Sequence, residues 1–270
     1  MKGTTAARRR ALVTGASSGI GLAFARVLAE HGHDLILTAR RLDRLESLAD
    51  ELRRRHGIDA VAIAGDLADP LAGQRLAETV AQRSLPVDLL VNNAGYGVPG
   101  SYAGTTWTDQ HKFLQVLVVA VAELTHRFVP GMIERRWGRI INVASLAGLL
   151  PGVAGHTLYA ASKAFVITFS ESLALETARH GIHVTASCPG FTLSEFHDVT
   201  GTRAQVSTMP AFMWRDADFV ARASYQAVMA GVPVVVPGRV NASVAALGRV
   251  LPRSLVRRLM TRNAKKFRRV

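Results

Sequence analysis

Tyr159 and Lys163 are the two residues of this sequence whose types and spacing best suit proton chemistry. They stand four positions apart in a stretch, 159–181, that we expect to be a helix ending at Gly181, so both side chains lie on one face. An ammonium group beside a phenol stabilises the phenolate and lowers the pKa of the phenol from about 10. Ser145 ends a preceding apolar run and could donate a hydrogen bond to a substrate oxygen. The three residues predict an acid–base site.

The glycine-rich segment TGASSGIG, at positions 14–21, is a second candidate site. Gly15 would allow a tight turn, while Gly19 and Gly21 would let the backbone approach a pyrophosphate at a helix N-terminus. The spacing G-x-x-x-G-x-G differs from the common dinucleotide pattern and from the P-loop, because no Lys-Ser/Thr pair follows. Its place after the first apolar run and before helical spacing favours a nucleotide site over a plain connection.

The residues after the second apolar run bear on the choice of nucleotide. An acidic residue about 20 positions beyond the glycines would bind the ribose 2′-hydroxyl of NAD. The chain instead reads Thr38-Ala39-Arg40-Arg41, and a guanidinium group suits a 2′-phosphate. This favours NADP, with Arg40 as the contact. For Arg41, a phosphate contact and simple solvation of the next helix remain equally open.

The chain predicts a scaffold that brings these distant residues together. Apolar runs indicate strands at 11–14, 34–40, 60–66, 87–95, 138–145, 182–190 and 232–238, and helical spacing indicates helices at 20–31, 42–55, 71–83, 109–134 and 159–181. Strands that alternate with helices in this way predict a doubly wound, mainly parallel α/β sheet with helices on both faces. We expect one domain over 1–240 and a basic amphipathic extension over 241–270. Segment 193–216 breaks the rhythm and is expected to form a substrate loop or lid rather than a packed surface excursion.

From about residue 9 to 240 the chain resembles a short-chain dehydrogenase/reductase (SDR). The resemblance is carried by T-G-x-x-x-G-x-G at 14–21, Asp66, N-N-A-G at 92–95, Ser145, Y-x-x-x-K at 159–163 and P-G at 189–190. It implies a Rossmann-like fold and hydride transfer between a nicotinamide and a carbonyl or alcohol. Tyr159 would exchange the proton, Lys163 would hold the nicotinamide ribose and lower the tyrosine pKa, and Ser145 would steady the carbonyl oxygen.

The resemblance also implies a set of cofactor-binding positions. Asp66 would meet the adenine, Asn92 and Ala94 would line the cofactor, and Thr192 and Ser194 would contact the carboxamide. With Arg40, Tyr159 and Lys163, the implied set is Gly15, Ser17, Ser18, Gly19, Ile20, Gly21, Asp66, Leu67, Asn92, Ala94, Gly95, Pro189, Gly190, Thr192 and Ser194.

Leu117 is a departure from the family pattern. Relatives place an asparagine in the middle of the long helix after N-N-A-G, where it helps to hold a water that links the lysine to solvent. In this chain that position falls on Leu117, within the apolar stretch QVLVVAVAEL, and leucine forms no hydrogen bonds. Gln115 lies on roughly the opposite helix face and is a poor substitute. A backbone carbonyl could hold the water, or turnover is slow, or the chain binds a cofactor with little catalysis.

Composition limits the partners and the compartment. The single cysteine, Cys188, excludes an intrachain disulfide and a cysteine metal site, and we expect a core position for it and no bound metal. The net charge of +13 comes from the two ends, because residues 1–10 carry four Lys/Arg and residues 239–270 carry ten without an acid. No uninterrupted apolar run approaches the roughly 20 residues of a membrane span, so a cytoplasmic, soluble protein is expected.

The expected partners follow from the same residues. Tyr96, Val98, Phe191, Phe212, Met213 and Trp214 suggest a small apolar carbonyl or alcohol substrate. A homo-oligomer, dimer or tetramer, is expected through helices 109–134 and 159–181. The basic segment after Pro252 would dock on the body or a sister subunit, lie on an anionic membrane surface, or fray. No nucleic-acid motif is found. An NADP-dependent oxidoreductase is the leading interpretation, and a weakly catalytic NADP-binding protein is the alternative.

Overall fold

The computed structural model describes residues 8–98, 100–152, 157–193, 214–252 and 254–258, and its centre is a parallel β-sheet. The sheet has seven strands in the order β3-β2-β1-β4-β5-β6-β9. They are β1 (Arg10–Thr14), β2 (Asp34–Ala39), β3 (Ala60–Ala64), β4 (Leu89–Asn92), β5 (Gly138–Val143), β6 (Ile182–Ser187) and β9 (Val234–Val235). Every neighbouring pair is parallel, so the predicted doubly wound, Rossmann-like sheet is confirmed. The strand order reverses between β1 and β4, which is where such sheets bind ligands.

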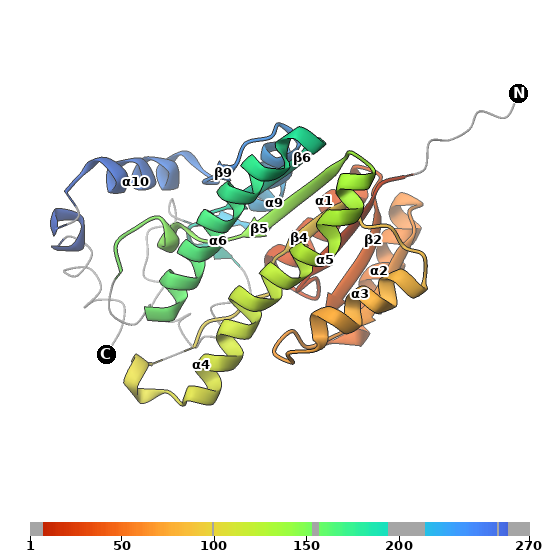
Figure 1. Ribbon diagram of the computed structural model, residues 1–270, viewed down its shortest axis with the longest axis horizontal. Helices are drawn as coiled ribbons and strands as arrows, with labels where there is room; N and C mark the ends of the chain where they lie inside the picture. Colours follow the sequence, from red (N-terminus) through yellow and green to blue (C-terminus); the bar gives the residue numbers. More distant parts are fainter. Residues whose placement is uncertain (1–7, 99, 153–156, 194–213, 253, 259–270) are drawn as a thin grey trace, which may run out of the picture.

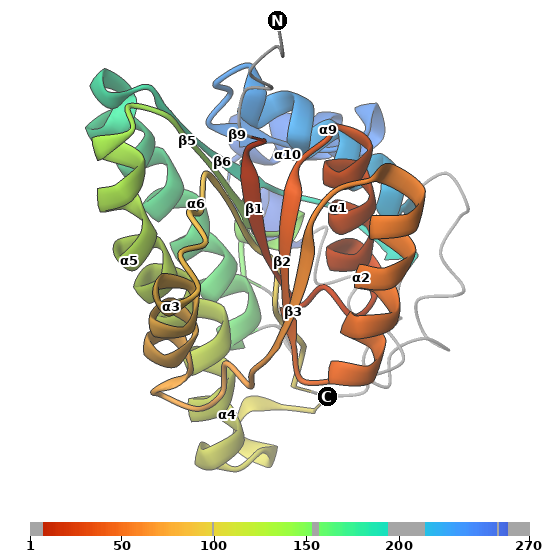
Figure 2. The same ribbon diagram turned by 90° about the vertical axis from the view of Figure 1, so that its right-hand side faces the viewer.

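Helices cover both faces of the sheet (Figures 1 and 2). One face carries α1 (Gly19–Glu30), α2 (Leu42–His56) and α9 (Ala217–Met229), and the other carries α3 (Ala72–Gln82), α4 (Trp107–Leu114), α5 (Ala120–Glu134) and α6 (Thr157–Thr177). Alternate strand residues feed the two cores, with Val13 and Leu37 packing beside α1 while Leu12 and Ile36 pack beside α3 and α5. Short 3₁₀ helices are η1 (Tyr102–Gly104), η3 (Leu146–Gly148) and η4 (Ala178–His180).

The long helix predicted at 109–134 is interrupted by a π-helix, η2 (Gln115–Val119). The backbone N–H of Ala120 donates to the carbonyl of Gln115, five residues back. The whole of Trp107–Glu134 has the length and composition of a membrane span, with a mean hydropathy of 1.5 over its most apolar window. However, 44% of that window is buried, because the helix packs against the sheet between α3 and α6. Burial in the core accounts for part of its apolar character.

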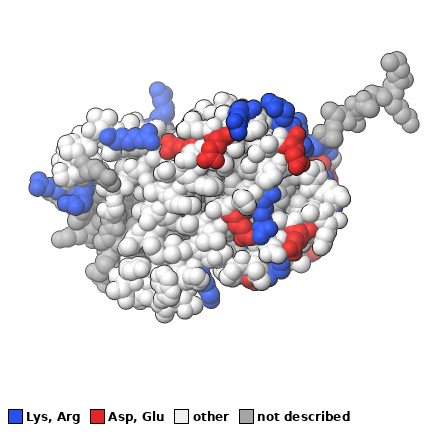
Figure 3. Space-filling view, in the orientation of Figure 1, with Lys and Arg blue, Asp and Glu red and all other residues white. Residues whose placement is uncertain are grey.

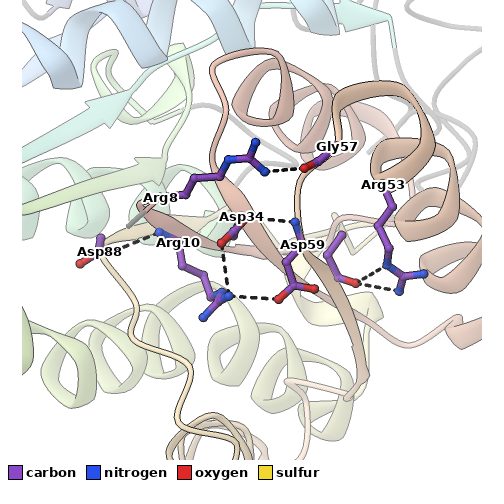
Figure 4. Close-up of polar contacts among 8 residues, drawn as sticks. Arg8, Arg10, Asp34, Arg53, Gly57, Asp59 and Asp88 are labelled. Carbon is purple, nitrogen blue, oxygen red and sulfur yellow. Dashed lines mark hydrogen bonds and ion pairs between the residues drawn. The ribbon is translucent and has the colours of Figure 1, made fainter. Parts of the chain in front are cut away.

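Charged side chains join the amino-terminal ends of the first three strands (Figure 4). The guanidinium of Arg10 pairs with Asp34 at 3.3 Å and with Asp59 at 3.0 Å, and the backbone N–H of Arg10 donates to Asp88 at 3.0 Å. Asp34 also accepts from the backbone N–H of Asp59 at 2.9 Å. This network fixes the end of the sheet opposite to the predicted site, because the strands are parallel.

The chain after the sheet packs on the domain before it becomes exposed. Helix α10 (Arg239–Val250) buries Asn241 and Ala245, whereas Leu247 and Val250 are 57% and 83% exposed. The boundary expected at 241 therefore falls inside a helix that contacts the body. Residues 254–258 are helical, as expected for the segment after Pro252, and residues 259–270 of the predicted basic tail lie outside the described residues.

The predicted substrate loop is described only at its two ends. Strands β7 (Thr192–Leu193) and β8 (Arg215–Asp216) pair in parallel, and the rings of Phe191 and Trp214 lie 5.6 Å apart. Residues 194–213, including Ser194, Phe212 and Met213, lie outside the described part of the chain. The described ends of this segment are therefore paired with each other.

Candidate active site

The glycine-rich turn at the carboxyl end of β1 is shaped for close backbone approach. Gly15 has a φ of +68°, and a Cβ on Gly21 would lie 2.2 Å from the carbonyl oxygen of Gly15. Ser18, at the N-cap of α1, makes no side-chain cap, and the first turn holds no acidic residue. The backbone N–H groups of this helix end therefore remain for an anion, and Ser17 and Ile20 flank the same turn. The turn fits the pyrophosphate of a dinucleotide.

Thr14 and Asn93 hold this turn against the N-N-A-G segment. The Oγ1 of Thr14 accepts from the backbone N–H groups of Asn93 and Ala94 at 2.9 and 3.0 Å, and it donates to the carbonyl of Val91 at 3.2 Å. Asn93 Nδ2 donates to the carbonyl of Thr14 at 2.9 Å. The sequence prediction did not include Thr14 or Asn93 among the site residues, although both stand inside the motifs that it used. Gly95, the last residue of N-N-A-G, is exposed.

Asn92 lies elsewhere than expected, because its side chain points into the core. Its Nδ2 donates to Thr125 Oγ1 at 3.0 Å and to Asn142 Oδ1 at 2.9 Å, and only 4% of the residue is exposed. Asn142 in turn donates to Ser170 Oγ at 2.9 Å. This series of hydrogen-bonded side chains links β4 and β5 to α5 and α6. Asn92 thus supports the site from below and does not line it.

The guanidinium of Arg41 contacts the glycine-rich turn. Its Nε and an Nη atom lie 3.3 and 3.1 Å from Ser17 Oγ. This contact places Arg41 at the turn, and whether it also contacts a 2′-phosphate stays a prediction. Arg40 is exposed beside it, and Asp66, also exposed, accepts from the backbone N–H of Ala68 at 3.1 Å. Leu67, which follows Asp66, is partly buried and packs against the cluster that contains Leu117.

Ser145, Tyr159 and Lys163 meet at the carboxyl end of β5. The Nζ of Lys163 donates to the carbonyl of Val143 at 2.7 Å, which ties α6 to the strand that leads into Ser145. Ser145 Oγ accepts from the backbone N–H of Ala147 at 3.1 Å, so its own proton is left for another acceptor. The Lys163 Nζ lies 5.8 Å from the centroid of the Tyr159 ring. The predicted spacing has put both side chains on one face of α6.

Burial changes the acid–base properties of Lys163. The residue is 6% exposed, and loss of solvation lowers the pKa of its ammonium group to about 8, while the nearby Cys188 has the weaker, opposite effect. Burial also raises the pKa of the Cys188 thiol to about 12, which fits the core position predicted for it. Lys163 is therefore poised to change charge close to neutral pH.

Gly148 is a supporting residue that the sequence prediction missed. A Cβ at this position would lie 2.6 Å from the backbone carbon of Lys163 and 2.8 Å from the backbone nitrogen of Ala164. The turn η3, which follows Ser145, can therefore pack directly on α6 only because Gly148 has no side chain. A glycine three positions after Ser145 was the available signal.

The P-G segment, residues 189–190, is bonded to the turn that follows Ser145. The carbonyl of Pro189 accepts from the backbone N–H of Leu146 at 2.9 Å. A Cβ on Gly190 would lie 2.6 Å from Asn241 Nδ2, and Thr192 Oγ1 donates to the carbonyl of Gly190 at 3.2 Å. Pro189 thus packs against the turn after Ser145, and the cofactor contacts expected of Pro189, Gly190 and Thr192 stay predictions.

Leu117 is buried in a small apolar cluster behind Tyr159. It is 1% exposed and belongs to the same cluster as Phe113 and Val116 of the long helix. A Cβ on Gly95 would be in contact with the Leu117 side chain, at 3.8 Å. Leucine fills this space beneath the N-N-A-G turn and supplies no polar atom there.

An open recess lies in front of Tyr159, and its wall mixes apolar and polar residues. It is lined by Val98, Gly100, Tyr102, Gln110, Phe113, Thr157, Leu158 and Tyr159. The ring of Tyr96 meets that of Phe113 edge-on, with centroids 5.7 Å apart, which supports this wall from behind. Val98 lines the recess and Tyr96 does not, and a substrate contact by either residue stays a prediction beside ordinary loop packing.

Comparison with known proteins agrees with this geometry. The family model described as short chain dehydrogenase matches residues 9–204. Oxidoreductase UcpA of Salmonella typhimurium is 38% identical over 183 residues, covering 68% of this chain and 69% of UcpA. The chain also superposes on a short-chain dehydrogenase from Sphingobium yanoikuyae in complex with NADPH, with a TM-score of 0.79 and 28% identity, covering 90% of this chain and 96% of that one.

A third relative is an L-sorbose reductase from Gluconobacter frateurii, solved with NADPH and L-sorbose. It superposes with a TM-score of 0.75 and 27% identity, covering 86% of this chain and 96% of that one. This chain thus carries a glycine-rich turn, a buried lysine and a serine at a strand end on the kind of sheet that these oxidoreductases share. The chain belongs to the short chain dehydrogenase family.

Proposed function

We propose that this protein is an NADP-dependent oxidoreductase that interconverts a small apolar carbonyl compound and its alcohol. The observation that carries the proposal is the placement of Lys163, buried and bonded to Val143, on the same helix face as Tyr159 and beside the end of β5 that leads to Ser145. The adjoining recess includes Tyr159 in its wall, together with the apolar residues Val98, Phe113 and Leu158. A reacting carbonyl in that recess would meet Tyr159, the proposed proton donor.

The acid–base step follows from the atoms at the site. When it is bound, the nicotinamide supplies or accepts the hydride at the substrate carbon. Tyr159 gives its hydroxyl proton to the substrate oxygen in reduction and takes it back in oxidation. Ser145 donates a second hydrogen bond to that oxygen, since its Oγ accepts from Ala147 and its hydroxyl proton is not used in that bond. The ammonium of Lys163 favours the phenolate that is left on Tyr159.

The preference for NADP is supported by Arg41 and Arg40. Arg41 reaches Ser17 in the glycine-rich turn, and Arg40 is exposed at the end of β2 where an acidic residue would favour NAD. Their guanidinium groups could form a bidentate contact with a 2′-phosphate. The NADPH-bound relatives point the same way.

A weakly catalytic, NADP-binding role is the second candidate, and Leu117 is the observation that favours it. An apolar residue in the buried cluster behind Tyr159 removes a polar side chain from the route by which a proton would be resupplied. The π-helix η2 at this position changes the backbone hydrogen bonding. Because π-turns occur often at functional sites, a backbone carbonyl of η2 is the candidate replacement.

Reduction of a panel of ketones and aldehydes, followed by the absorbance of NADPH, separates the two candidates. We expect wild-type protein to turn over at least one apolar carbonyl compound, and Tyr159→Phe to abolish that activity. Tyr225→Phe is the matched control, because the Tyr225 hydroxyl contacts His33 at 3.0 Å, away from the recess. If the protein binds NADPH but no activity depends on Tyr159, the enzymatic proposal is wrong and the binding role is favoured.

We also propose that the protein forms homo-oligomers through the outer face of α5 and α6. Phe165 and Leu175 of α6 are 40% and 83% exposed, and Val119 beside α5 is 46% exposed. Figure 3 shows this side of the molecule as largely uncharged surface. A protein that sediments as a monomer at micromolar concentration would contradict the proposal.

The C-terminal segment is proposed to dock on the body or a sister subunit, with binding to an anionic membrane as the alternative. Leu247, Val250 and Leu255 are exposed on α10 and the helical turn after it, with Arg249 among them. Flotation with anionic liposomes of the full chain and of a chain ending at Val250 distinguishes the two. Equal behaviour removes the membrane alternative.

A further inference from the structure

Gln110 is a buried polar side chain in the wall of the substrate recess. It belongs to α4, is 7% exposed, and lines the recess together with Phe113 and Leu158. The function proposed above gives Gln110 no role, since the proton is assigned to Tyr159 and the hydride to the nicotinamide. A buried amide needs hydrogen-bond partners, so its contacts show what it can offer to a ligand.

The hydrogen bonds around Thr105 fix the orientation of the Gln110 amide. Thr105 has one hydroxyl proton, which it donates to the carbonyl of Tyr102 at 2.9 Å. The Oγ1 of Thr105 lies 2.7 Å from Nε2 of Gln110. In this contact the Thr105 oxygen can therefore act only as an acceptor. The nitrogen of the amide must face Thr105, and the choice between nitrogen and oxygen is settled by this network.

The amide oxygen of Gln110 is thereby turned away from Thr105. Within the described part of the chain, no hydrogen bond uses this Oε1, while Nε2 is engaged. Water can satisfy the oxygen as long as the recess is open. A ligand that fills the recess displaces that water, and the oxygen then needs a donor from the ligand.

We propose that Gln110 is a specificity-determining residue whose Oε1 accepts a hydrogen bond from a hydroxyl group of the substrate, a group distinct from the reacting carbonyl. The inference rests on the proposed oxidoreductase function and narrows its substrate class to hydroxylated ketones and the matching diols. The substrate is then apolar along Phe113 and Leu158, with one hydroxyl directed at Gln110. Thr105 is the positioning residue that keeps the acceptor facing the ligand.

Sets of three ketones test the proposal. Each set holds a methyl ketone with a terminal hydroxyl, its methoxy ether and its deoxy counterpart, over increasing chain lengths. A methoxy group cannot donate to Oε1, so filling the recess with it leaves a buried acceptor unpaired. At the chain length that fits, we expect kcat/KM for the hydroxy ketone to exceed that for the ether by roughly tenfold or more. Equal values for hydroxy ketone and ether at every length would overturn the proposal.

Two variants assign the preference to Gln110. Gln110→Met keeps the length of the side chain without hydrogen bonding, and it should bring the hydroxy-to-methoxy ratio close to one while the deoxy ketone is still reduced. Thr105→Val frees the amide to rotate and should lower the ratio part of the way. Gln74→Met is the matched control, because Gln74 is exposed on α3 and pairs with Glu78 at 2.8 Å. An unchanged ratio in Gln110→Met contradicts the role of Gln110, and an unchanged ratio in Thr105→Val contradicts the role of Thr105.

A binding measurement separates failure of this inference from failure of the proposed function. The dissociation constants of hydroxy ketone and ether are measured by calorimetry on protein saturated with oxidised NADP, which cannot reduce them. Absence of turnover for every ketone, with the binding ratio intact, would remove the oxidoreductase proposal and keep the Gln110 contact. Turnover without any preference for the hydroxy ketone over the ether, in rate or in binding, would remove the Gln110 contact and keep the oxidoreductase proposal.

Discussion

Lys163 is expected to make the stability of this protein depend on pH, and replacement by methionine should remove that dependence. The pKa of Lys163 in the folded protein is about 8, compared with 10.5 for an exposed lysine, and burial is the main cause. Below pH 8 the ammonium is charged in both the folded and the unfolded chain. The cost of burying the charge, about 3 kcal/mol for a shift of this size, is then fully present and lowers stability.

The free energy of unfolding should therefore rise as the pH increases from about 8 toward 10.5. Over this range the folded protein releases the proton of Lys163 while the unfolded chain still holds it, so the unfolded state binds more protons. Lys163→Met carries no charge and lacks this contribution. It also leaves the carbonyl of Val143 without its donor, which costs about 1–3 kcal/mol. Because this cost is close to the cost of burying the charge, wild type and Lys163→Met should have similar stability near pH 7.

Urea unfolding of wild type and Lys163→Met, from neutral pH to about pH 10, measures the difference directly. Subtracting the two curves removes the titration of all other groups that the variants share. We expect wild type to gain about 2–3 kcal/mol relative to the variant as the pH rises. Lys112→Met, at an exposed position on α4, is the control and should run parallel to wild type. A difference between wild type and Lys163→Met that stays flat above pH 8 would refute the reasoning.

Further predictions concern the departure in the long helix, the cofactor preference and the sheet end. Leu117→Asn should raise kcat by restoring a polar group, while lowering stability by about 2–4 kcal/mol because a fully buried leucine is lost; an unchanged or lower rate across pH contradicts the proton-supply argument. Arg41→Ala should raise KM for NADPH about tenfold with little effect on NADH, with a smaller effect for Arg40→Ala, and equal effects on both cofactors would exclude a 2′-phosphate contact. Asp34→Asn should lower the free energy of unfolding by about 1–3 kcal/mol, and with it the urea midpoint, because Arg10 loses a partly buried charged partner. An unchanged midpoint would show that the Arg10–Asp34 pair adds nothing to stability.

The elements and the reactive residues could be predicted because their signals are local. Strand periodicity, the Tyr159–Lys163 spacing and the glycine-rich turn each depend on a few adjacent positions, and each was found where it was expected. The π-helix η2 could not be predicted in this way, because an apolar run reads the same in an α-helix and in a π-turn.

Residues whose role depends on distant parts of the chain were missed or misplaced. Asn92 ends a strand, like the site residues, but the alternation along β4 turns its side chain toward Thr125 on α5. Gly148 matters only because the backbone of Lys163 packs against it. The orientation of Gln110 depends on the single proton of Thr105 being used elsewhere. Such roles follow from tertiary contacts and not from residue type or spacing.

The burial of Lys163 connects the cost of folding to the chemistry. Among the described residues no carboxylate lies in contact with its ammonium group, which bonds to the carbonyl of Val143 alone. A buried charge of this kind is relieved by any negative charge that forms beside it. Tyr159 is the group on the same helix face that can become negative, and it does so when it gives up its proton. In the proposed reaction, part of the energy spent on burying Lys163 is therefore recovered when the phenolate forms on Tyr159.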